Sequence, residues 1–270
     1  MSIIQAIIIA IIEGLTEYLP ISSTAHMVFT SALFGIAEDE YVKMFQVSIQ
    51  FGAILAVVFL YWKKFFDFSK FDFYIKLGFA VVPALVLGYF FDDYIEAVLE
   101  KPLPIAIVLM VGGIILLFVD RWFKEPRITE EKDISIATAV KIGFWQCLAM
   151  MPGVSRAAAS IIGGMQQKLS REVAAEFSFF LAVPTMMAVT AYSIFVKKWQ
   201  VGSDTLRGYQ MILADNQHIL MFALGNIIAF VVAVLAIKFF INMIKKYGFG
   251  LWGWYRIAIG LLLMILFWNN

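Results

Sequence analysis

Six stretches of this 270-residue chain are long and apolar enough to cross a lipid bilayer, which takes about 20 residues of helix. They cover residues 41–62, 75–91, 103–119, 173–195, 218–240 and 251–268. Hydrophobic residues make up 62% of the chain and charged residues only 15%, a composition that excludes a water-soluble domain. A net charge of +1, with no dense basic stripe, gives no reason to expect nucleic acid as a partner.

Two further apolar regions, 1–36 and 136–165, are interrupted near their middles. The first contains Pro20-Ile-Ser-Ser-Thr and the second Pro152-Gly-Val-Ser-Arg, which break a helix and bring polar groups to membrane depth. Such interruptions are typical of re-entrant hairpins, in which two half-helices enter and leave through the same face. We therefore predict an all-α polytopic membrane protein with six spanning helices and two re-entrant helical hairpins.

The placement of lysine and arginine predicts how the chain is threaded, because cytoplasmic loops carry the excess of both. Loops 63–76, 120–141, 166–172 and 238–250 hold 4, 5, 2 and 3 of these residues, or 14, whereas loops 37–43, 92–102 and 196–217 hold 1, 1 and 3, or 5. This split places both chain ends on the outer side. The first hairpin then enters from the outer face and the second from the cytoplasmic face.

The two breaks occupy matching positions in a duplicated sequence. Glu13 precedes Ser22 by nine residues, and Gln146 precedes Ser155 by nine, so the offset is 133 in both pairs. Because the hairpins enter from opposite faces, this is an inverted-topology repeat. Its halves are about 1–125 and 134–270, within one integral membrane domain of residues 1–270.

Two glycine pairs, Gly112-Gly113 and Gly163-Gly164, permit close approach between helices. Packing inside the chain is the favoured interpretation, and a homodimer formed through these glycine-bearing faces is the alternative. Tryptophans such as Trp62 and Trp122 fall near predicted span ends, where indole rings lie at the level of the lipid headgroups.

Ionisable side chains inside the membrane point to function, because each costs roughly 2.5–3.5 kcal/mol at the bilayer centre. Glu13 and Glu17 are one helical turn apart, so both lie on one face of the first half-helix. The hydroxyls of residues 22–24 can cap the returning half-helix, whose first turn carries His26. A helix N-terminus of this kind attracts anions, and the neighbouring side chains could supply a nucleophile and a proton carrier.

The second break places a cation in the membrane. Ser155 can cap the next half-helix, and Arg156 follows it with a planar guanidinium that suits phosphate. Two half-helices that enter from opposite faces would hold a diphosphate near the midplane. The structural alternatives are a buried pairing of the two acids with Arg156, simple capping by the hydroxyls, and a histidine that serves packing alone.

The sequence Glu-Gly-Leu-Thr-Glu-Tyr-Leu-Pro-Ile-Ser-Ser-Thr-Ala-His at 13–26, with Pro-Gly-Val-Ser-Arg at 152–156, resembles the undecaprenyl-diphosphate phosphatases associated with bacitracin resistance. The resemblance covers nearly the whole chain and includes residues 45–57 and 175–184. It implies a multi-pass enzyme of the bacterial inner (plasma) membrane with its site open to the periplasmic face. Its reaction would convert undecaprenyl diphosphate, a C55 isoprenoid diphosphate, to undecaprenyl phosphate and phosphate, which recycles the lipid carrier for peptidoglycan synthesis.

The chain departs from the family pattern at two places. The family usually continues Ser-Arg-Ser-Gly-x-Thr, where this chain has Ser155-Arg-Ala-Ala-Ala-Ser, and Ala25 replaces a usual glycine. All charged participants are retained, so these changes bear on substrate range and rate more than on the class of reaction.

The same resemblance implies roles for individual residues. Arg156 clamps the diphosphate, Ser23 attacks the terminal phosphorus, Glu17 positions or deprotonates the attacking group, and His26 carries a proton. Further substrate contacts are expected from Ser22, Thr24, Gln50, Ser155 and Ser160. Glu13 and Glu17 are expected to hold a divalent cation, Mg²⁺ or Ca²⁺, since both ions prefer oxygen ligands. The sequence leaves open whether His26 or water attacks in place of Ser23.

A transporter or flippase of a polyprenyl phosphate or a small anion is the alternative function, because inverted repeats with broken helices are also transporter architecture. Binding an anion needs only Arg156 and the helix ends, whereas phosphoryl transfer also needs a nucleophile and a proton carrier. Ser23 and His26 provide these extra groups, so hydrolysis is the favoured prediction.

Overall fold

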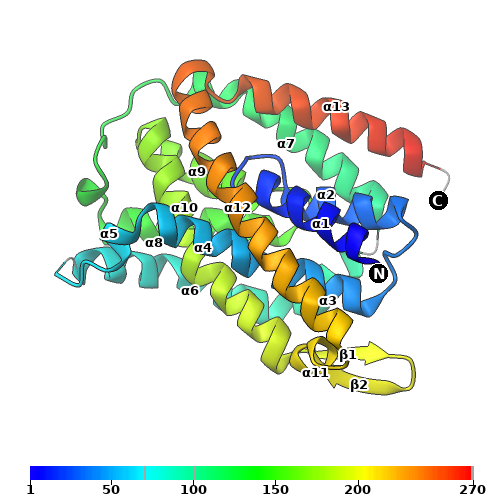
Figure 1. The fold of residues 1–270 in the computed structure, drawn as a ribbon. Helices are drawn as coiled ribbons and strands as arrows, with labels where there is room; N and C mark the ends of the chain where they lie inside the picture. The colour runs from blue at the N-terminus through cyan, green and yellow to red at the C-terminus, as the bar shows by residue number, and fades with distance from the viewer. Residues whose placement is uncertain (70, 100, 269–270) are drawn as a thin grey trace.

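The computed structural model describes residues 1–69, 71–99 and 101–268, and they fold almost entirely into helices (Figure 1). Lys70, counted above in loop 63–76, and the last two residues of the predicted domain lie outside the described residues. The elements are α1 (Ile3–Thr16), α2 (Ser23–Leu33), α3 (Glu40–Ser48), α4 (Gln50–Leu60), α5 (Trp62–Phe65), α6 (Phe71–Leu99), α7 (Pro102–Trp122), α8 (Ile136–Gln146), α9 (Arg156–Gln166), α10 (Arg171–Ala191), α11 (Gly208–Ile212), α12 (Asn216–Tyr247) and α13 (Gly250–Phe267), with strands β1 (Lys198–Val201) and β2 (Asp204–Arg207). Short 3₁₀ turns occupy Glu131–Asp133 and Cys147–Met150, and a π-helical turn occupies Tyr192–Val196.

Within the described residues, six segments are long and apolar enough to span a membrane, as predicted. They are Glu40–Leu60, Phe71–Phe91, Pro102–Trp122, Arg171–Val196, Asn216–Tyr247 and Gly250–Phe267. The protein is therefore an all-α polytopic membrane protein.

The spans differ from the prediction in two details. The first is divided at Ile49 into α3 and α4, where the N–H of Gly52 donates to Oδ1 of Asn226 on α12 at 2.9 Å. The fifth continues to Tyr247, well past the predicted end at residue 240. Lysines near its C-terminus do not end the helix, because cations interact favourably with the negative end of the helix dipole.

Both predicted hairpins are present, α1 with α2 and α8 with α9. Ser22 and Ser155, at the repeat offset of 133, are the residues immediately before α2 and α9. Both have a positive φ, 69° and 75°, which is rare for a residue other than glycine and costs roughly 1–3 kcal/mol. The two breaks thus share one unusual backbone geometry.

The two halves of the chain interlock. Helix α1 packs against α12 of the second half, α8 packs against α6 of the first, and α7 runs along α13 (Figure 1). Glycines make the first two crossings possible: a Cβ added to Gly14 would lie 2.7 Å from the carbonyl oxygen of Ala229, and one added to Gly143 would overlap that of Ala80. Each hairpin is therefore held mainly by the other half of the molecule.

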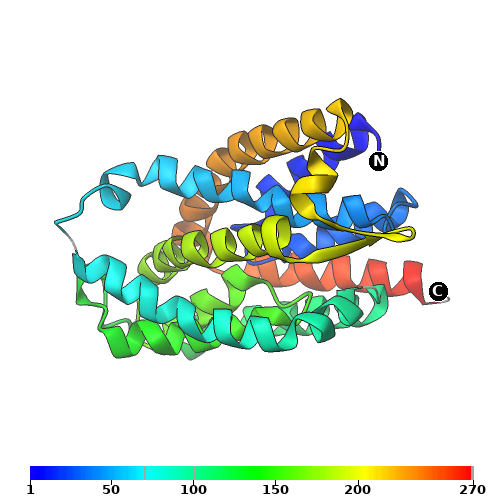
Figure 2. The ribbon, with the colours of Figure 1, turned by 90° about the horizontal axis from the view of Figure 1, so that it is seen from below.

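The ends of the helices are grouped as the lysine and arginine counts predict. The start of α1, the end of α13 and the β1–β2 hairpin lie at one end of the molecule, whereas the loops that follow α5 and α7 lie at the other (Figure 2). Helices α1 and α8 start from these opposite ends (Figure 2). The two hairpins accordingly enter from opposite faces.

The two glycine pairs are used inside the chain. Gly112 and Gly113 pack against α13, where a Cβ on Gly113 would lie 2.8 Å from the carbonyl oxygen of Gly253. A Cβ on Gly163 would lie 2.5 Å from Cβ of Trp145 on α8, within the second hairpin. These glycine-bearing faces are therefore used for packing inside the chain, and a homodimer stays a prediction.

The segment 196–217, expected as a plain loop, contains a two-stranded antiparallel sheet and the short helix α11. Gly202, with φ of 62°, forms the turn between the strands. Trp199 on β1 is buried, and its indole N–H donates to the carbonyl oxygen of Ser193 at 3.1 Å. The hairpin is thus fixed to the end of α10 instead of extending freely from the membrane.

Candidate active site

The first break turns the N-terminus of a half-helix into the protein. Helix α1 ends at Thr16 and α2 begins at Ser23; between them Pro20 lacks an N–H and cannot continue the helix. The Ser22 hydroxyl accepts from the N–H of Ala25 at 3.4 Å and so caps α2. Other N–H groups of the first turn of α2 have no partner within the helix and point into the break.

The second break repeats this arrangement. After the 3₁₀ turn at Cys147–Met150, Gly153 adopts φ of 97° in a close approach to α7, where a Cβ would lie 2.7 Å from the carbonyl oxygen of Ile105. The Ser155 hydroxyl accepts from the N–H of Ala158 at 3.2 Å, and α9 begins at Arg156. Each half therefore contributes one helix N-terminus, and the contact between Arg156 and Glu17 brings the two breaks together.

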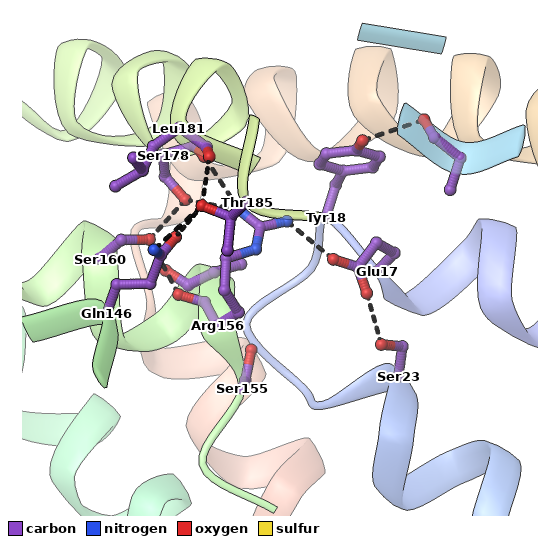
Figure 3. Close-up of polar contacts among 12 residues, drawn as sticks. Glu17, Tyr18, Ser23, Gln146, Ser155, Arg156, Ser160, Ser178, Leu181 and Thr185 are labelled. Atoms are coloured by element: carbon purple, nitrogen blue, oxygen red, sulfur yellow. Dashed lines mark hydrogen bonds and ion pairs between the residues drawn. The ribbon is translucent and has the colours of Figure 1, made fainter. Parts of the chain in front are cut away.

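A carboxylate joins the two breaks (Figure 3). One oxygen of Glu17 accepts from Nη2 of Arg156 at 2.8 Å, and the other accepts from the hydroxyl of Ser23 at 2.6 Å. Both charged side chains are largely buried, with exposed fractions of 4% for Glu17 and 9% for Arg156. A charged hydrogen bond in such surroundings is short and strong, so this chain of three groups has a defined geometry.

Arg156 is oriented by neighbours on three sides (Figure 3). Its Nη1 donates to the carbonyl oxygen of Ser178 on α10 at 2.9 Å and to the hydroxyl of the same residue at 3.2 Å. Its guanidinium carbon lies 5.6 Å from the ring centroid of Tyr18, whose hydroxyl is fixed by the carbonyl oxygen of Ala53 at 2.9 Å. The guanidinium is thus held in place independently of Glu17.

A cavity of about 1190 Å³ adjoins the two breaks. Its polar wall includes Glu17, Ser22, Ser23, Thr24, Gln50, Gln146, Ser155, Arg156 and Thr185. Its apolar wall includes Met27, Val28, Leu85, Leu103, Met186, Val189 and Phe267. Lys43, Lys101 and Lys197, from the predicted loops 37–43, 92–102 and 196–217, also line the cavity.

Most of the residues predicted to meet the substrate line this cavity. The hydroxyls of Ser22, Thr24 and Ser155 and the amide of Gln50 are on its wall, and the amide oxygen of Gln50 is buried without a hydrogen-bond partner among the described residues. Ser160 differs from the prediction, because it is fully buried behind Arg156. Its hydroxyl donates to the carbonyl oxygen of Arg156 at 2.8 Å, so it supports the arginine from behind.

His26 is turned toward α13. Its Nδ1 lies 2.8 Å from the carbonyl oxygen of Ser22, which can only accept, so this nitrogen carries the proton. Its Nε2 then accepts from the hydroxyl of Tyr255 at 2.9 Å, and the two rings are stacked. Both ring nitrogens of His26 are therefore engaged in holding the first break.

Glu13 and its repeat counterpart Gln146 have different surroundings. Glu13 is fully buried, both of its carboxylate oxygens are without a hydrogen-bond partner among the described residues, and it interacts electrostatically with Glu17 and Arg156. Gln146 donates through Nε2 to the hydroxyl of Thr185 at 3.1 Å. The first half thus carries an unsatisfied acid where the second half carries a satisfied amide.

Sequence reasoning missed several members of this site. They are Tyr18, Ser178, Thr185, Tyr255 and Arg256. Tyr18 and Ser178 lie inside stretches that already carried the family resemblance, so a role could have been suspected. Thr185 and Tyr255 lie within long apolar segments, where a hydroxyl has no local pattern that separates a site from ordinary packing. Arg256 is a charge inside such a segment, and that alone could have marked it.

Comparison with known proteins gives the family. Residues 6–262 match the family described as bacitracin resistance protein BacA. The chain belongs to the BacA family. Family relatives include an undecaprenyl-diphosphatase of Flavobacterium johnsoniae, 50% identical over 267 residues, which cover 98% of this chain and 96% of the relative.

More distant BacA relatives carry the same description. The undecaprenyl-diphosphatase of Porphyromonas gingivalis is 44% identical over 283 residues, covering 98% of this chain and 97% of the relative. That of Campylobacter jejuni is 40% identical over 269 residues, covering 99% and 95%. The similarity therefore extends over the whole membrane domain.

Proposed function

We propose that this protein hydrolyses undecaprenyl diphosphate to undecaprenyl phosphate and inorganic phosphate, and so recycles the lipid carrier of cell-wall synthesis. Bacitracin resistance is the corresponding role of its family. The observation that carries the proposal is the contact chain Ser23–Glu17–Arg156 on the wall of the cavity. A hydroxyl paired with a carboxylate, beside a fixed guanidinium, supplies both an activated nucleophile and a phosphate-binding group.

The walls of the cavity support a lipid diphosphate as the substrate. Its polar wall offers two helix N-termini and Arg156, which suit a headgroup with several negative charges. The apolar wall, including Met27 and Leu85, suits the first isoprene units of the tail. The remaining units of a C55 chain extend into the surrounding bilayer, where they need no binding site.

In the first step, the hydroxyl of Ser23 attacks the terminal phosphorus. Its proton passes to the Glu17 oxygen 2.6 Å away, the Oγ–P bond forms, and the bond from phosphorus to the bridging oxygen breaks. Undecaprenyl phosphate leaves as an anion and needs no proton donor, because the second pKa of a phosphate monoester is about 6. Arg156 and the N–H groups of α2 neutralise the charge of the transferring group.

In the second step, water attacks the phosphoserine. The water oxygen bonds to phosphorus as the Oγ–P bond of Ser23 breaks, Glu17 returns its proton to Oγ, and both protons of the water leave on the released phosphate. This scheme leaves His26 with a positioning role, in which it holds the carbonyl oxygen of Ser22 away from the phosphate. Attack by Ser23 is favoured over attack by His26, because the hydroxyl contacts a carboxylate while both ring nitrogens are engaged elsewhere.

A divalent cation fits the acidic part of the site. The two unpartnered carboxylate oxygens of Glu13 are the hard donors that Mg²⁺ and Ca²⁺ prefer, and Glu17 is its electrostatic neighbour. These two residues would hold the ion, which would supply further neutralisation of the diphosphate. Among the described residues no cluster of three or more His, Cys, Asp or Glu could hold a metal, so phosphate or water oxygens would complete its ligands.

The enzyme works in the inner membrane with its cavity open to the periplasm. The cavity is lined by Lys43, Lys101 and Lys197, which come from the predicted loops that hold the smaller share of lysine and arginine. A diphosphate released on the outer side of the membrane can therefore enter without crossing it.

Phosphate release from undecaprenyl diphosphate by the purified protein in detergent tests this function. We expect release by the wild type, a lower rate after treatment with a chelator, and loss of release in Glu17→Gln with lipid binding retained. Wild-type protein that binds the lipid but releases no phosphate would overturn the proposal and favour transport of the lipid. Full activity in Glu17→Gln would instead mean that the active site lies elsewhere in the molecule.

A further inference from the structure

Arg256 on α13 is a fully buried cation that the chemical steps above do not use. Its side chain is 0% exposed and forms four hydrogen bonds. Nη1 donates to the carbonyl oxygens of Pro20 at 3.1 Å and Val154 at 2.9 Å, Nη2 to that of Gly153 at 2.8 Å, and Nε to that of Leu109 at 3.0 Å. Three of these four acceptors belong to the two breaks, so one side chain contacts both.

The direction of these bonds matters for anion binding. A helix break frees N–H groups, which attract a phosphate, and carbonyl groups, which repel it. The carbonyl oxygens of Pro20, Gly153 and Val154 point at a guanidinium that water does not reach, and hence away from the cavity. The N–H groups at the start of α2 and α9 are left as the polar groups that meet the ligand.

We propose that Arg256 is a positioning residue that joins the two breaks, so that their half-helix N-termini form one site for a ligand with two phosphates. Without this connection each N-terminus would remain a separate site for a single phosphate. The inference rests on the proposed function, because it assigns one phosphate of the substrate to each half of the molecule.

The surroundings of Arg256 are shaped for a guanidinium. A Cβ added to Gly112 on α7 would overlap the guanidinium, so the absence of a side chain there provides the space. Lysine could not replace the arginine, because one ammonium on a flexible stem cannot reach acceptors on both breaks and α7 together. The repeat does not supply the contact twice, because α7, the counterpart of α13 in the first half, carries a basic residue only in its last turn, Arg121.

Binding measurements separate this role from simple stabilisation. The probes are farnesyl phosphate, with one phosphate, and farnesyl methylenediphosphonate, with two and no cleavable bridge. For Arg256→Lys we expect affinity for the diphosphonate to fall about tenfold or more, as the loss of one set of charged hydrogen bonds predicts, with affinity for the monophosphate almost unchanged. Equal losses for both probes, or no loss for either, would overturn the inference.

Two further variants keep the test decisive. Gly112→Ala should push the guanidinium from its place and cause the same selective loss, so it decides the outcome if Arg256→Lys does not fold. Arg171→Lys, in a partly exposed pair with Asp120 at 2.6 Å, is the matched control and should leave both affinities unchanged. Because binding is measured without turnover, failure here is distinct from failure of wild-type protein to release phosphate from undecaprenyl diphosphate.

Discussion

The short contact between Ser23 and Glu17 predicts that substitutions of these two residues are not additive. The hydroxyl donates to Oε2 of Glu17 at 2.6 Å, and the other carboxylate oxygen is occupied by Arg156. If the carboxylate acts by accepting the proton of this hydroxyl, it has nothing to accept once the hydroxyl is removed. Glu17→Gln and Ser23→Ala should therefore affect one and the same step.

The expected losses follow from this arrangement. Glu17→Gln keeps the size of the side chain and an oxygen that can accept from Arg156, so it removes mainly the base. General-base catalysis contributes about 10²–10⁴-fold, and kcat should fall by that amount. Ser23→Ala should cost at least as much. The double variant should match Ser23→Ala within about threefold, whereas independent effects would multiply to about 10⁴–10⁸-fold.

The assay is phosphate release at saturating undecaprenyl diphosphate for the wild type, both single variants and the double variant. Thermal unfolding in the same detergent shows whether each variant is folded. Glu172→Gln is the matched control, because this acid lies in an exposed pair with Lys245 at 3.0 Å, and such pairs contribute about 0–1 kcal/mol. Its kcat should equal that of the wild type.

Multiplied losses in the double variant would refute this reasoning. They would mean that the carboxylate of Glu17 and the hydroxyl of Ser23 act at different points of the reaction. The nucleophile would then have to be sought in water or in His26.

Further predictions concern packing, metal binding and the histidine. Gly143→Ala should lower the midpoint of thermal unfolding by an amount equivalent to about 1–3 kcal/mol, since its Cβ would overlap the carbonyl oxygen of Ala80 at the crossing of α8 and α6. Gly78→Ala, where a Cβ meets nothing within 4 Å, should instead raise the midpoint slightly, by an amount equivalent to up to about 1 kcal/mol of unfolding free energy. Glu13→Gln should raise the Mg²⁺ concentration needed for half-maximal phosphate release, and an unchanged titration would exclude this acid as a ligand. Tyr255→Phe should destabilise the protein by about 1 kcal/mol with kcat almost unchanged, whereas a loss as large as that of Glu17→Gln would place His26 in the chemistry.

The sequence was sufficient to predict the spans and the breaks, because both depend on local properties. An apolar run must be helical to cross a bilayer, and a proline beside hydroxyl residues inside such a run cannot continue the helix. The grouping of loops followed from the count of lysine and arginine, which depends on the chain alone. These features need no knowledge of which helices touch.

Contacts between distant segments were beyond the sequence. The hydrogen bond that accompanies the division at Ile49 is accepted by Asn226, which is 177 positions away in the chain, so no pattern near residue 49 predicts it. The placement of Ser160 behind Arg156 depends on Ser178 of the next helix, whose hydroxyl lies 2.7 Å from that of Ser160. A serine on a half-helix looks the same in the sequence whether it faces a cavity or a neighbouring helix.

Arg256 could have been identified from the sequence as a charge inside the membrane. The chain has 21 lysines and arginines, and the loop counts of 14 and 5 account for 19 of them. The remaining two, 21 − 19, are Arg156 and Arg256. Both are therefore cations inside the membrane, where a charge is costly, and both contact the breaks. The partners of Arg256 are backbone carbonyls, which every residue has, so the sequence does not predict which of them it contacts.

The attachment of Glu17 to Arg156 also bears on how the reaction ends. Any anion that approaches the guanidinium competes with a carboxylate tethered to the same chain, at a high effective concentration. A diphosphate can displace it by engaging two helix N-termini at once, whereas either monophosphate product holds only one. Glu17 thereby competes with the products for Arg156, which favours their release before the next lipid binds.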